Sequence, residues 1–392
     1  MKIFCPRVLN GNRGDIASRL GVLLTFRKEG VLDIVVSCRR KEEIFPSGYT
    51  AVPCGKLYNF LPSRAGLRVL LDCDAIIWTC GLDLQDDSSL LKLLHTFLLF
   101  LYYRILGKKI YVLNQGAGPI NRKSGVFLTR LILSLTDLFI TRDSRTHNLL
   151  SSINPEAKLL QGYDAIFTSS FSEVLGSDRA LYPKDISGQR SPLIGFNIRR
   201  WYHFSSSLLP YKYDRKSYES RGVADMEKIV SAGITFCSRM IKEYNARILL
   251  FSMYEAGIDP WESEEKYLIK IRDTVGKGIE LFDTSATLEE FCNGISSCDI
   301  MVGMRLHSTL LALRCGVPAI NLSYTLKGRD IFSDLGLGDW VVDLDTFKDS
   351  PEELVVKVRS LLQEKQKLDN IQRVISLNDA VIKKCIMQIL QT

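Results

Sequence analysis

The chain has 392 residues, of which 46% are hydrophobic and 24% charged, with 27 glycines and 12 prolines. These values exclude collagen-like, low-complexity and disordered proteins, and a chain of this length buries a large core without disulfides or metals. The 51 basic residues exceed the 44 acidic ones by seven. This mild excess suits anionic small molecules or an anionic membrane surface, and it is too small to indicate nucleic-acid binding.

The cysteines and the first residues indicate a cytoplasmic protein. The ten cysteines are scattered and none forms a CxxC pair, which predicts reduced, structural thiols. Residues 1–6 run straight into an expected strand and lack the apolar core of a signal peptide. No carboxylate–histidine cluster has metal-ligand spacing, so we assign no metal ligand and no cofactor; dependence on a divalent metal stays open.

In the first half, short apolar runs alternate with helical patterns, which is typical of α/β architecture. We expect buried strands and intervening helices in this order: strand 1–5, helix 15–29, strand 32–37, strand 75–78, helix 88–106, strand 109–113, helix 124–134, strand 138–141 and helix 144–151.

The segment 90–106 is the most apolar helix of the chain. Lys92, His95 and Arg104 interrupt it, so it lacks the roughly 18 unbroken apolar residues of a spanning helix. Two interpretations stay open. It is either a buried helix of the α/β layer or a helix at a membrane surface, helped by Lys108 and Lys109.

The second half restarts the alternation after 173–191, a stretch rich in Gly, Ser, Pro and charges that we interpret as the domain boundary. We therefore predict domains at 1–180 and 190–392, both Rossmann-like and facing each other across a cleft. Such domains bind ligands at the carboxyl ends of their strands. From residue 351 the chain is helical, and its last stretch can reach back across the cleft. The expected elements are strand 193–198, helix 226–245, strands 246–251, 279–282, 299–303 and 318–322, and helices 287–296 and 308–314.

Two strand ends carry candidate anion-binding residues. A buried strand ends at Gly303 and a helix begins near Ser308, which puts Arg305 and His307 beside a helix N-terminus, where N–H groups and a guanidinium bind anions. Arg199 follows the strand 193–198 and points toward the same cleft. The alternatives are an arginine that caps a loop, a histidine satisfied within the interface, and a surface arginine.

Two glycine-rich turns follow strands of the first half, at 10–15 and 115–119. Neither is a GxGxxG fingerprint or a Walker A loop, which argues against dinucleotide or P-loop chemistry. They are either an acceptor or phosphate pocket, or tight turns that need glycine for conformational reasons.

Several of these segments together resemble the polysaccharide pyruvyl transferase family, from about residue 10 to about 345. Arg13 departs from the family pattern, because a small residue is common at that position of the first turn. The matching segments are Gly11-Asn12-Arg13-Gly14-Asp15, Gln115-Gly116-Ala117-Gly118-Pro119, Thr141-Arg142-Asp143-Ser144, Asp164-Ala165-Ile166-Phe167, Gly303-Met304-Arg305-Leu306-His307-Ser308 and Tyr324-Thr325-Leu326-Lys327.

The resemblance implies a GT-B-like architecture and an enzyme that transfers the enolpyruvyl group of phosphoenolpyruvate to two hydroxyls of one sugar, forming a cyclic ketal in cell-surface polysaccharide synthesis. The implied acceptor is a glycan or lipid-linked oligosaccharide, handled in the cytoplasm or at the inner face of the membrane, with peripheral membrane contact.

The same resemblance implies residue roles. Arg305 stabilises the leaving phosphate, and His307 is the general acid or base. The donor-binding set is Arg199, Arg305, Leu306, Ser308 and Lys327. Lys327 is expected in a loop, where the alternative is a solvated lysine without a role in binding. The acceptor or cleft set is Asn12, Asp15, Gly116, Gly118, Arg142 and His147.

Two other functions stay open. One is a nucleotide-sugar glycosyltransferase of the same architecture, many of which hold the donor ribose with a Glu; the interval 319–350 contains none. The other is a non-catalytic sugar- or anion-binding protein that has kept the fold.

Overall fold

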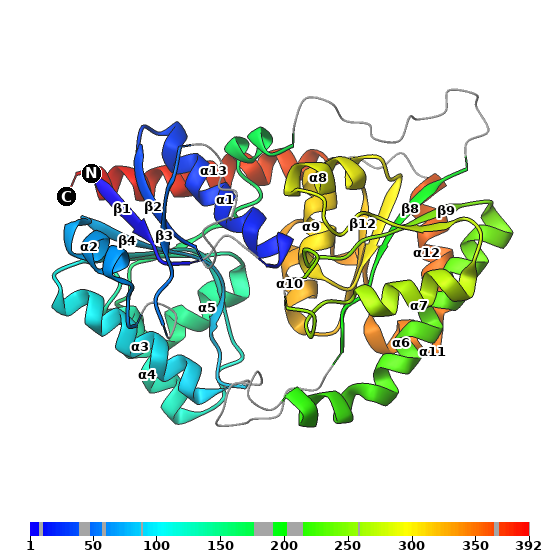
Figure 1. Ribbon diagram of the computed structural model, residues 1–392, viewed down its shortest axis with the longest axis horizontal. Coiled ribbons are helices and arrows are strands. Elements are labelled where there is room, and N and C mark those ends of the chain that lie inside the picture. The colour runs from blue at the N-terminus through cyan, green and yellow to red at the C-terminus, as the bar shows by residue number, and fades with distance from the viewer. Residues whose placement is uncertain are drawn as a thin grey trace.

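The computed structural model describes residues 1–7, 11–38, 48–56, 60–87, 89–175, 191–201, 215–257, 259–363 and 368–391. Within them the chain forms two parallel sheets with interleaved helices, so the predicted α/β class is confirmed. We call the first sheet with α1–α5 the first unit, and the second sheet with α6–α12 the second unit (Figure 1).

The first sheet has seven parallel strands in the order β3-β2-β1-β4-β5-β6-β7. The order reverses direction between β1 and β4, and ligands of such sheets bind at the carboxyl ends of the strands at this switch point. The strands are β1 (Lys2–Cys5), β2 (Asp33–Cys38), β3 (Thr50–Pro53), β4 (Ala75–Leu84), β5 (Lys109–Ala117), β6 (Leu138–Thr141) and β7 (Leu159–Gln161).

Helices cover both faces of this sheet because successive strand side chains point to opposite sides. Ile3 and Cys5 pack into one core, whereas Phe4 packs into the core on the other face. The helices of the first unit are α1 (Arg13–Lys28), α2 (Arg64–Asp72), α3 (Leu90–Ile105), α4 (Lys123–Ser134) and α5 (Ser144–Ile153), followed by the 3-10 turn η1 (Ser169–Glu173).

The second sheet has six parallel strands in the order β10-β9-β8-β11-β12-β13, with its switch point between β8 and β11. Its strands are β8 (Leu193–Asn197), β9 (Arg247–Leu250), β10 (Ile279–Leu281), β11 (Ile300–Gly303), β12 (Ala319–Ser323) and β13 (Val341–Asp343). Its helices are α6 (Arg215–Tyr244), α7 (Glu265–Val275), α8 (Leu288–Ser296), α9 (Leu306–Arg314), α10 (Leu326–Asp334), α11 (Leu344–Asp349) and α12 (Pro351–Gln363), with the 3-10 turn η3 (Gly338–Trp340).

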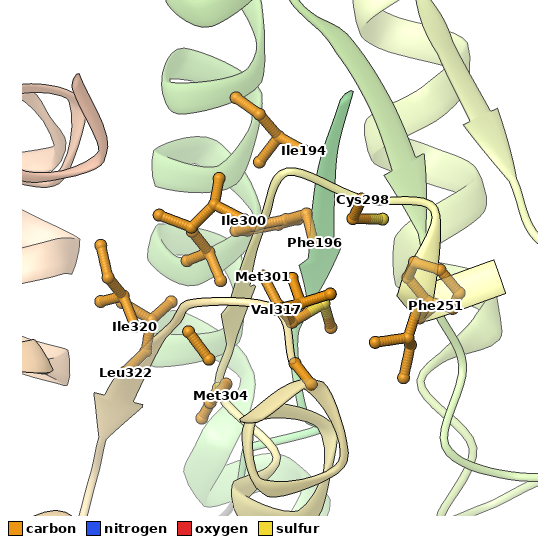
Figure 2. Close-up of a cluster of buried hydrophobic side chains, with 14 of the residues drawn as sticks. Ile194, Phe196, Phe251, Cys298, Ile300, Met301, Met304, Val317, Ile320 and Leu322 are labelled. Carbon is orange, nitrogen blue, oxygen red and sulfur yellow. The ribbon is translucent and has the colours of Figure 1, made fainter. Parts of the chain in front are cut away.

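Figure 2 shows the core between the central strands of the second sheet and its helices. Phe196 and Met301 are fully buried on neighbouring strands, β8 and β11, and Phe251 stacks on Phe282 with ring centroids 5.1 Å apart. This rigid layer holds the ends of β8 and β11 in place.

The last helix, α13 (Asp369–Leu390), crosses back to the first unit, where it runs beside α1 (Figure 1). Ile382, Ile386 and Ile389 belong to the core of the first sheet. The predicted bounds 1–180 and 190–392 stay a prediction, because 176–190 lies outside the described residues. Helix α13 belongs by sequence to the predicted second domain, but in the structure it packs on the first unit.

Several elements differ from expectation. The segment 115–117, predicted as part of a turn, continues strand β5 by pairing with β4 and β6. The edge strands β3, β7 and β13, and the helices α2, α7 and α10, were not predicted. The strands among them have three or four residues, too few for periodicity to reveal. No described helix is long and apolar enough to cross a membrane.

Candidate active site

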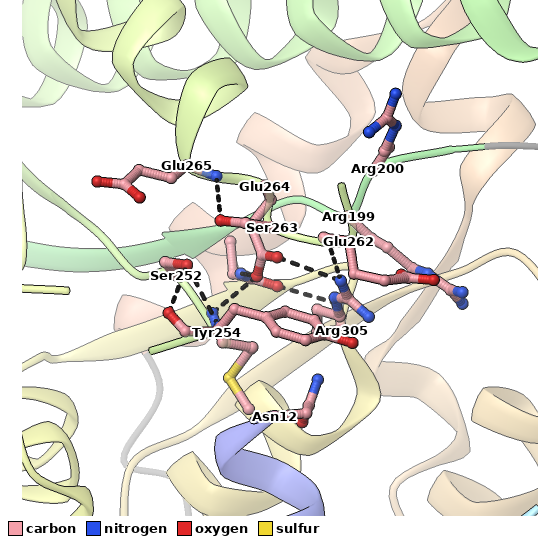
Figure 3. Close-up of polar contacts among 12 residues, drawn as sticks. Asn12, Arg199, Arg200, Ser252, Tyr254, Glu262, Ser263, Glu264, Glu265 and Arg305 are labelled. Carbon is pink, nitrogen blue, oxygen red and sulfur yellow. Dashed lines mark hydrogen bonds and ion pairs between the residues drawn. The ribbon is translucent and has the colours of Figure 1, made fainter. Parts of the chain in front are cut away.

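Arg199 and Arg305, which we call the arginine pair, follow β8 and β11 at the switch point of the second sheet. Asn197, at the end of β8, accepts a hydrogen bond from the backbone N–H of Arg305 at 3.1 Å. Figure 3 shows the two guanidinium groups near each other, while Arg200 points away. Arg200 instead bonds to Glu219 and to the carbonyl of Trp261.

The charge of Arg305 is balanced by a buried carboxylate. Its Nη2 donates to Glu264 Oε2 at 3.2 Å and to the Glu262 carbonyl at 3.0 Å, and its guanidinium lies 5.0 Å from the Tyr254 ring centroid. Burial alone would lower the pKa of Arg305, but the charges of Glu264, Tyr254 and Glu262 together outweigh burial and the repulsion of Arg199, so the pKa is raised. Arg199 bonds to the Tyr324 hydroxyl. Glu264 therefore offsets one of the two positive charges of the arginine pair.

His307 lies in the first turn of α9 and contacts the first unit. Its Nε2 is 3.2 Å from Asp164 Oδ2 and 3.3 Å from Ser18 Oγ, and Ser18 donates to Asp164 Oδ1 at 2.6 Å. We call Ser18, Asp164 and His307 the interface triad. Burial would raise the pKa of Asp164, but His307, Arg142 and the Ser18 hydrogen bond hold it well below its usual range. An ionised Asp164 only accepts, so Nε2 carries a proton and Nδ1 is the nitrogen left for chemistry.

Glycine at position 14 makes this contact sterically possible. It is the second residue of α1, and a methyl group there would overlap the His307 side chain. The glycine that the sequence assigned to a turn is therefore required for the approach of the two units.

Arg142 and Lys327, which we call the cationic pair, lie beside the interface triad. The Arg142 side chain is 2% exposed and its Nη1 is 3.7 Å from Asp164 Oδ2. Its Nε and Nη2 make no hydrogen bond with any described residue. Burial and the positive charge of Arg142 lower the pKa of Lys327 to about 7, against the opposing charges of Asp143 and Asp164. A buried guanidinium with unused donors next to a lysine is suited to an anion.

Gly116 packs against this arginine. A Cβ atom at Gly116 would lie 2.8 Å from Arg142 Nε. Gly118 has φ +83°, a conformation that favours glycine. The structure therefore requires glycine at both positions. Gly116 also leaves the space that the Arg142 side chain of the cationic pair occupies.

Asn12 and Asp15 lie at the start of α1. Asn12 is the N-cap and accepts from the backbone N–H of Gly14 at 2.9 Å. The Asp15 side chain is 41% exposed. Burial would raise its pKa, but Arg19 and His307 outweigh burial and the pKa is lowered. The structure thus brings Asp15 near the interface triad and makes Asn12 a helix cap.

Three other predicted residues lie on helices. Leu306, the first residue of α9, is half-buried against the core. His147 is half-buried on α5. Lys327 is the second residue of α10 and half-buried, so it is neither in a loop nor fully solvated. Thr325 is the N-cap of this helix, a residue type that marks helix starts, although its side chain makes no cap hydrogen bond.

The predicted phosphate contact of Ser308 stays a prediction, and in the structure both donors of this residue are used within the protein. Ser308 is fully buried, and both its N–H and its hydroxyl donate to the Arg305 carbonyl, at 3.0 and 2.6 Å. The helix begins at Leu306, two residues earlier than expected, which turns Ser308 toward the core.

Sequence reasoning missed Ser18, Glu264 and the role of Asp164. A polar Ser18 among the buried residues of α1 is one signal that could have been used. Asp164 begins a segment quoted for the family resemblance, but only the fold places it against His307. Within the described ranges, no group of three His, Cys, Asp or Glu residues is arranged to hold a metal.

The fold has many relatives among solved structures. The UDP-GlcNAc 2-epimerase of Methanocaldococcus jannaschii is 13% identical with a TM-score of 0.61, over 98% of this chain and 99% of that one. The S. aureus MnaA–UDP co-structure is 13% identical with a TM-score of 0.59, over 100% and 97%. At such identities the likeness shows a shared GT-B-like fold and nothing about substrates.

Sequence comparison identifies the family. The amylovoran biosynthesis protein AmsJ of Erwinia amylovora is 20% identical over 306 residues, which cover 76% of this chain and 67% of that protein. The family model of the polysaccharide pyruvyl transferases matches residues 12–325, a span that includes the interface triad, the arginine pair and Arg142. By this match the chain is a transferase, a member of the polysaccharide pyruvyl transferase family.

Proposed function

We propose that this protein transfers the enolpyruvyl group of phosphoenolpyruvate to two hydroxyls of a glycan hexose, forming a cyclic ketal, in cell-surface polysaccharide synthesis. One observation supports this most strongly: Asp164 holds His307 at the junction of the units, and the same carboxylate oxygen lies 3.7 Å from Arg142 Nη1. Phosphoenolpyruvate carries a phosphate and a carboxylate on the carbon that reacts. It therefore needs two anion sites and a proton-transfer group close together.

The cationic groups receive the two anionic parts of the donor. The unused donors of Arg142 and the Lys327 ammonium form one site. The arginine pair, partly offset by Glu264, forms the other. Charge developing on the departing phosphate is stabilised by such fixed cations.

The proposed reaction balances without a cofactor. The methylene carbon gains one proton, the central carbon forms two C–O bonds to the hydroxyls, and its C–O bond to phosphate breaks. One hydroxyl proton ends on the methyl group and the other leaves with the phosphate. His307 relays the first of these through Nδ1, because Asp164 occupies Nε2.

The acceptor we propose is a glycan on a lipid carrier, a galactose or mannosamine derivative being the sugar modified, at the cytoplasmic face of the membrane. The relative AmsJ is named for amylovoran biosynthesis, which supports a role in polysaccharide assembly.

Thermal stability with candidate donors tests the donor class. Phosphoenolpyruvate should raise the melting temperature of the wild type, and nucleotide-sugars should not. Arg142→Ala and Lys327→Ala should lose this response. Arg145→Ala, which removes an arginine whose side chain is 46% exposed, should keep it.

Product analysis tests the reaction. Wild-type protein with phosphoenolpyruvate and extracted glycan should release phosphate and yield a pyruvyl ketal by mass spectrometry. Cells that lack the gene should lose that ketal. A nucleotide-sugar that stabilises the protein and is turned over would instead establish a glycosyltransferase.

A further inference from the structure

The outward side of α3 and α4 exposes a row of large apolar side chains. Leu91, Leu98 and Ile105 are 37, 40 and 75% exposed on α3, and Phe127 is 61% exposed on the neighbouring α4. Figure 1 shows both helices at the outer edge of the first unit, away from the second. Single exposed apolar residues are common, but a row shared by two packed helices marks an interaction surface.

The spacing makes the row continuous. Leu91, Leu94, Leu98, Leu101 and Ile105 follow one another at intervals of three and four, so they lie on one side of the helix. We call these five residues with Phe127 the apolar ridge. The same spacing is typical of coiled coils, but α3 has 16 residues and provides little more than two heptads, fewer than a stable coiled coil uses.

All charged residues in the sequence interval that carries the ridge are basic. Between Asp87 and Asp137 the chain contains no Asp or Glu and seven Lys or Arg residues: Lys92, Arg104, Lys108, Lys109, Arg122, Lys123 and Arg130. Lys92 and Arg104 pair with carboxylates beyond this interval, Asp83 and Asp137, and remain partly exposed. Lys123 and Arg130 are exposed on α4. The excess of basic residues would repel a second copy of this face and attract an anionic surface.

We propose that the apolar ridge docks on an anionic lipid bilayer, with the ridge in the headgroup boundary and the surrounding cations on lipid phosphates. Helices α3 and α4 begin at the carboxyl edge of the first sheet, so Leu91 and Phe127 lie at the end of the ridge nearest the active site. The proposal places this end of the ridge, like the other end, at the membrane. It builds on the proposed lipid-linked acceptor, although binding itself requires neither donor nor acceptor.

Vesicle flotation tests the proposal. The probes are vesicles of phosphatidylcholine alone and of phosphatidylcholine with phosphatidylglycerol. The full-length wild type should float with the anionic vesicles only. Binding should weaken between about 0.1 M and about 1 M salt, since the screening length falls from about 10 Å to about 3 Å. The double variant Leu98→Gln, Ile105→Gln should bind at least about tenfold more weakly.

A matched control replaces an apolar residue elsewhere. Val356→Gln, at a position of α12 that is 67% exposed, should float like the wild type. Melting curves should be alike for all three proteins, because the altered side chains are exposed. The double variant should also keep its phosphate release with a soluble acceptor.

Three results would overturn the proposal: wild type that does not float, a double variant that floats equally well, or a wild-type dimer that the double variant converts to monomer. The last would make the ridge a protein–protein interface. Because flotation needs no catalysis, its failure would leave the transfer reaction standing, and failure of the reaction would leave the docking surface standing.

Discussion

At the scale of single residues, the imidazole of His307 depends on side chains from the other unit. Asp164 and Ser18 hold its Nε2, and Gly14 leaves the room that the ring occupies. Proton transfer is efficient only when the imidazole has the correct tautomer and position. The two units therefore both contribute to the surroundings of the proposed proton-transfer group.

Replacing His307 should separate chemistry from binding. His307→Asn keeps a polar side chain but cannot relay a proton, so turnover should fall about 100- to 10,000-fold while donor affinity changes less. Phosphate release under steady-state conditions measures both. Asp164→Asn should show a similar loss through the wrong tautomer. If His307→Asn kept most of its turnover, the proton relay would belong to another group, with Lys327 next in position.

Gly14→Ala should displace His307 without disturbing the helix. The residue is helical and needs no unusual backbone angle, so the methyl group acts only through its overlap with the imidazole. Turnover should fall about 100-fold, the scale of an ångström-sized misplacement. Gly66→Ala, in the first turn of α2, serves as the control, because its methyl group would come no closer than 3.2 Å to any atom, the nearest being the Ser63 hydroxyl. Equal activity of the two variants would contradict the close approach.

The lowered pKa of Lys327 predicts a pH dependence of donor binding. With a pKa of about 7, this lysine is mostly charged at pH 6 and mostly neutral at pH 8. Donor affinity should therefore fall as pH rises through 7, by up to about tenfold. Lys327→Arg stays charged, so the part of the pH dependence that comes from residue 327 should disappear. The part that comes from titration of the donor itself should be the same in both proteins. Identical pH profiles of KM would remove Lys327 from the donor site.

At the scale of elements, the N-terminus of α1 is fastened to the second unit by Arg13. This fully buried side chain donates to four carbonyls of the second unit at 2.7–3.1 Å, and its guanidinium lies 4.9 Å from the Phe291 ring centroid. The acceptors are the carbonyls of Ser252, Tyr254, Thr284 and Ala286. The residue that departs from the family pattern is thus part of the joint between the units.

Arg13→Met should destabilise the protein by at least about 3 kcal/mol, because several buried carbonyls lose their donors. Urea unfolding measures the change. Arg145→Met removes another arginine that crosses the interface, one that is 46% exposed and pairs with Asp330. Arg145→Met should lower the free energy of unfolding by less than about 1 kcal/mol. Similar costs for both variants would contradict the role of Arg13.

Elements that are long and buried could be predicted from sequence, and short or contact-dependent ones could not. Strand β6 begins and ends where its apolar run does. The segment 115–117 reads as a turn because of its glycine, and only its pairing with β4 makes it strand. Likewise, Arg305 and His307 were placed correctly at a strand end, whereas the partners Glu264 and Asp164 lie 41 and 143 residues away in sequence.

At the scale of the whole molecule, α13 ties the two units together a second time. Asn378 is fully buried on this helix; it donates to the carbonyls of Asp164 and Phe167 at 3.1 and 3.0 Å and accepts from the Tyr163 N–H at 3.1 Å. The loop that carries Asp164 is therefore held from behind by a helix that follows the second unit in the chain.

Asn378→Ala should cost about 2–4 kcal/mol, since it leaves several buried backbone groups unpaired. It should also lower turnover, because the Asp164 loop loses its support. Urea unfolding and phosphate release measure the two effects. Leu377→Ala, at a neighbouring position that is 44% exposed, should stay within about 0.5 kcal/mol of the wild type. If Asn378→Ala kept wild-type stability and turnover, the loop that carries Asp164 would not depend on Asn378 for its conformation.

This crossing also sets the order in which the protein matures during translation. Domains generally fold as they emerge from the ribosome, but the first sheet keeps one apolar face incompletely covered until Ile382, Ile386 and Ile389 have been made. The nascent first unit is therefore an aggregation-prone intermediate with exposed apolar surface, and chaperones should recognise it. Asp164 gains its support from Asn378 only after both sheets have been synthesised. A prematurely terminated chain that lacks α13 should consequently be cleared as misfolded protein rather than persist as a partly active enzyme.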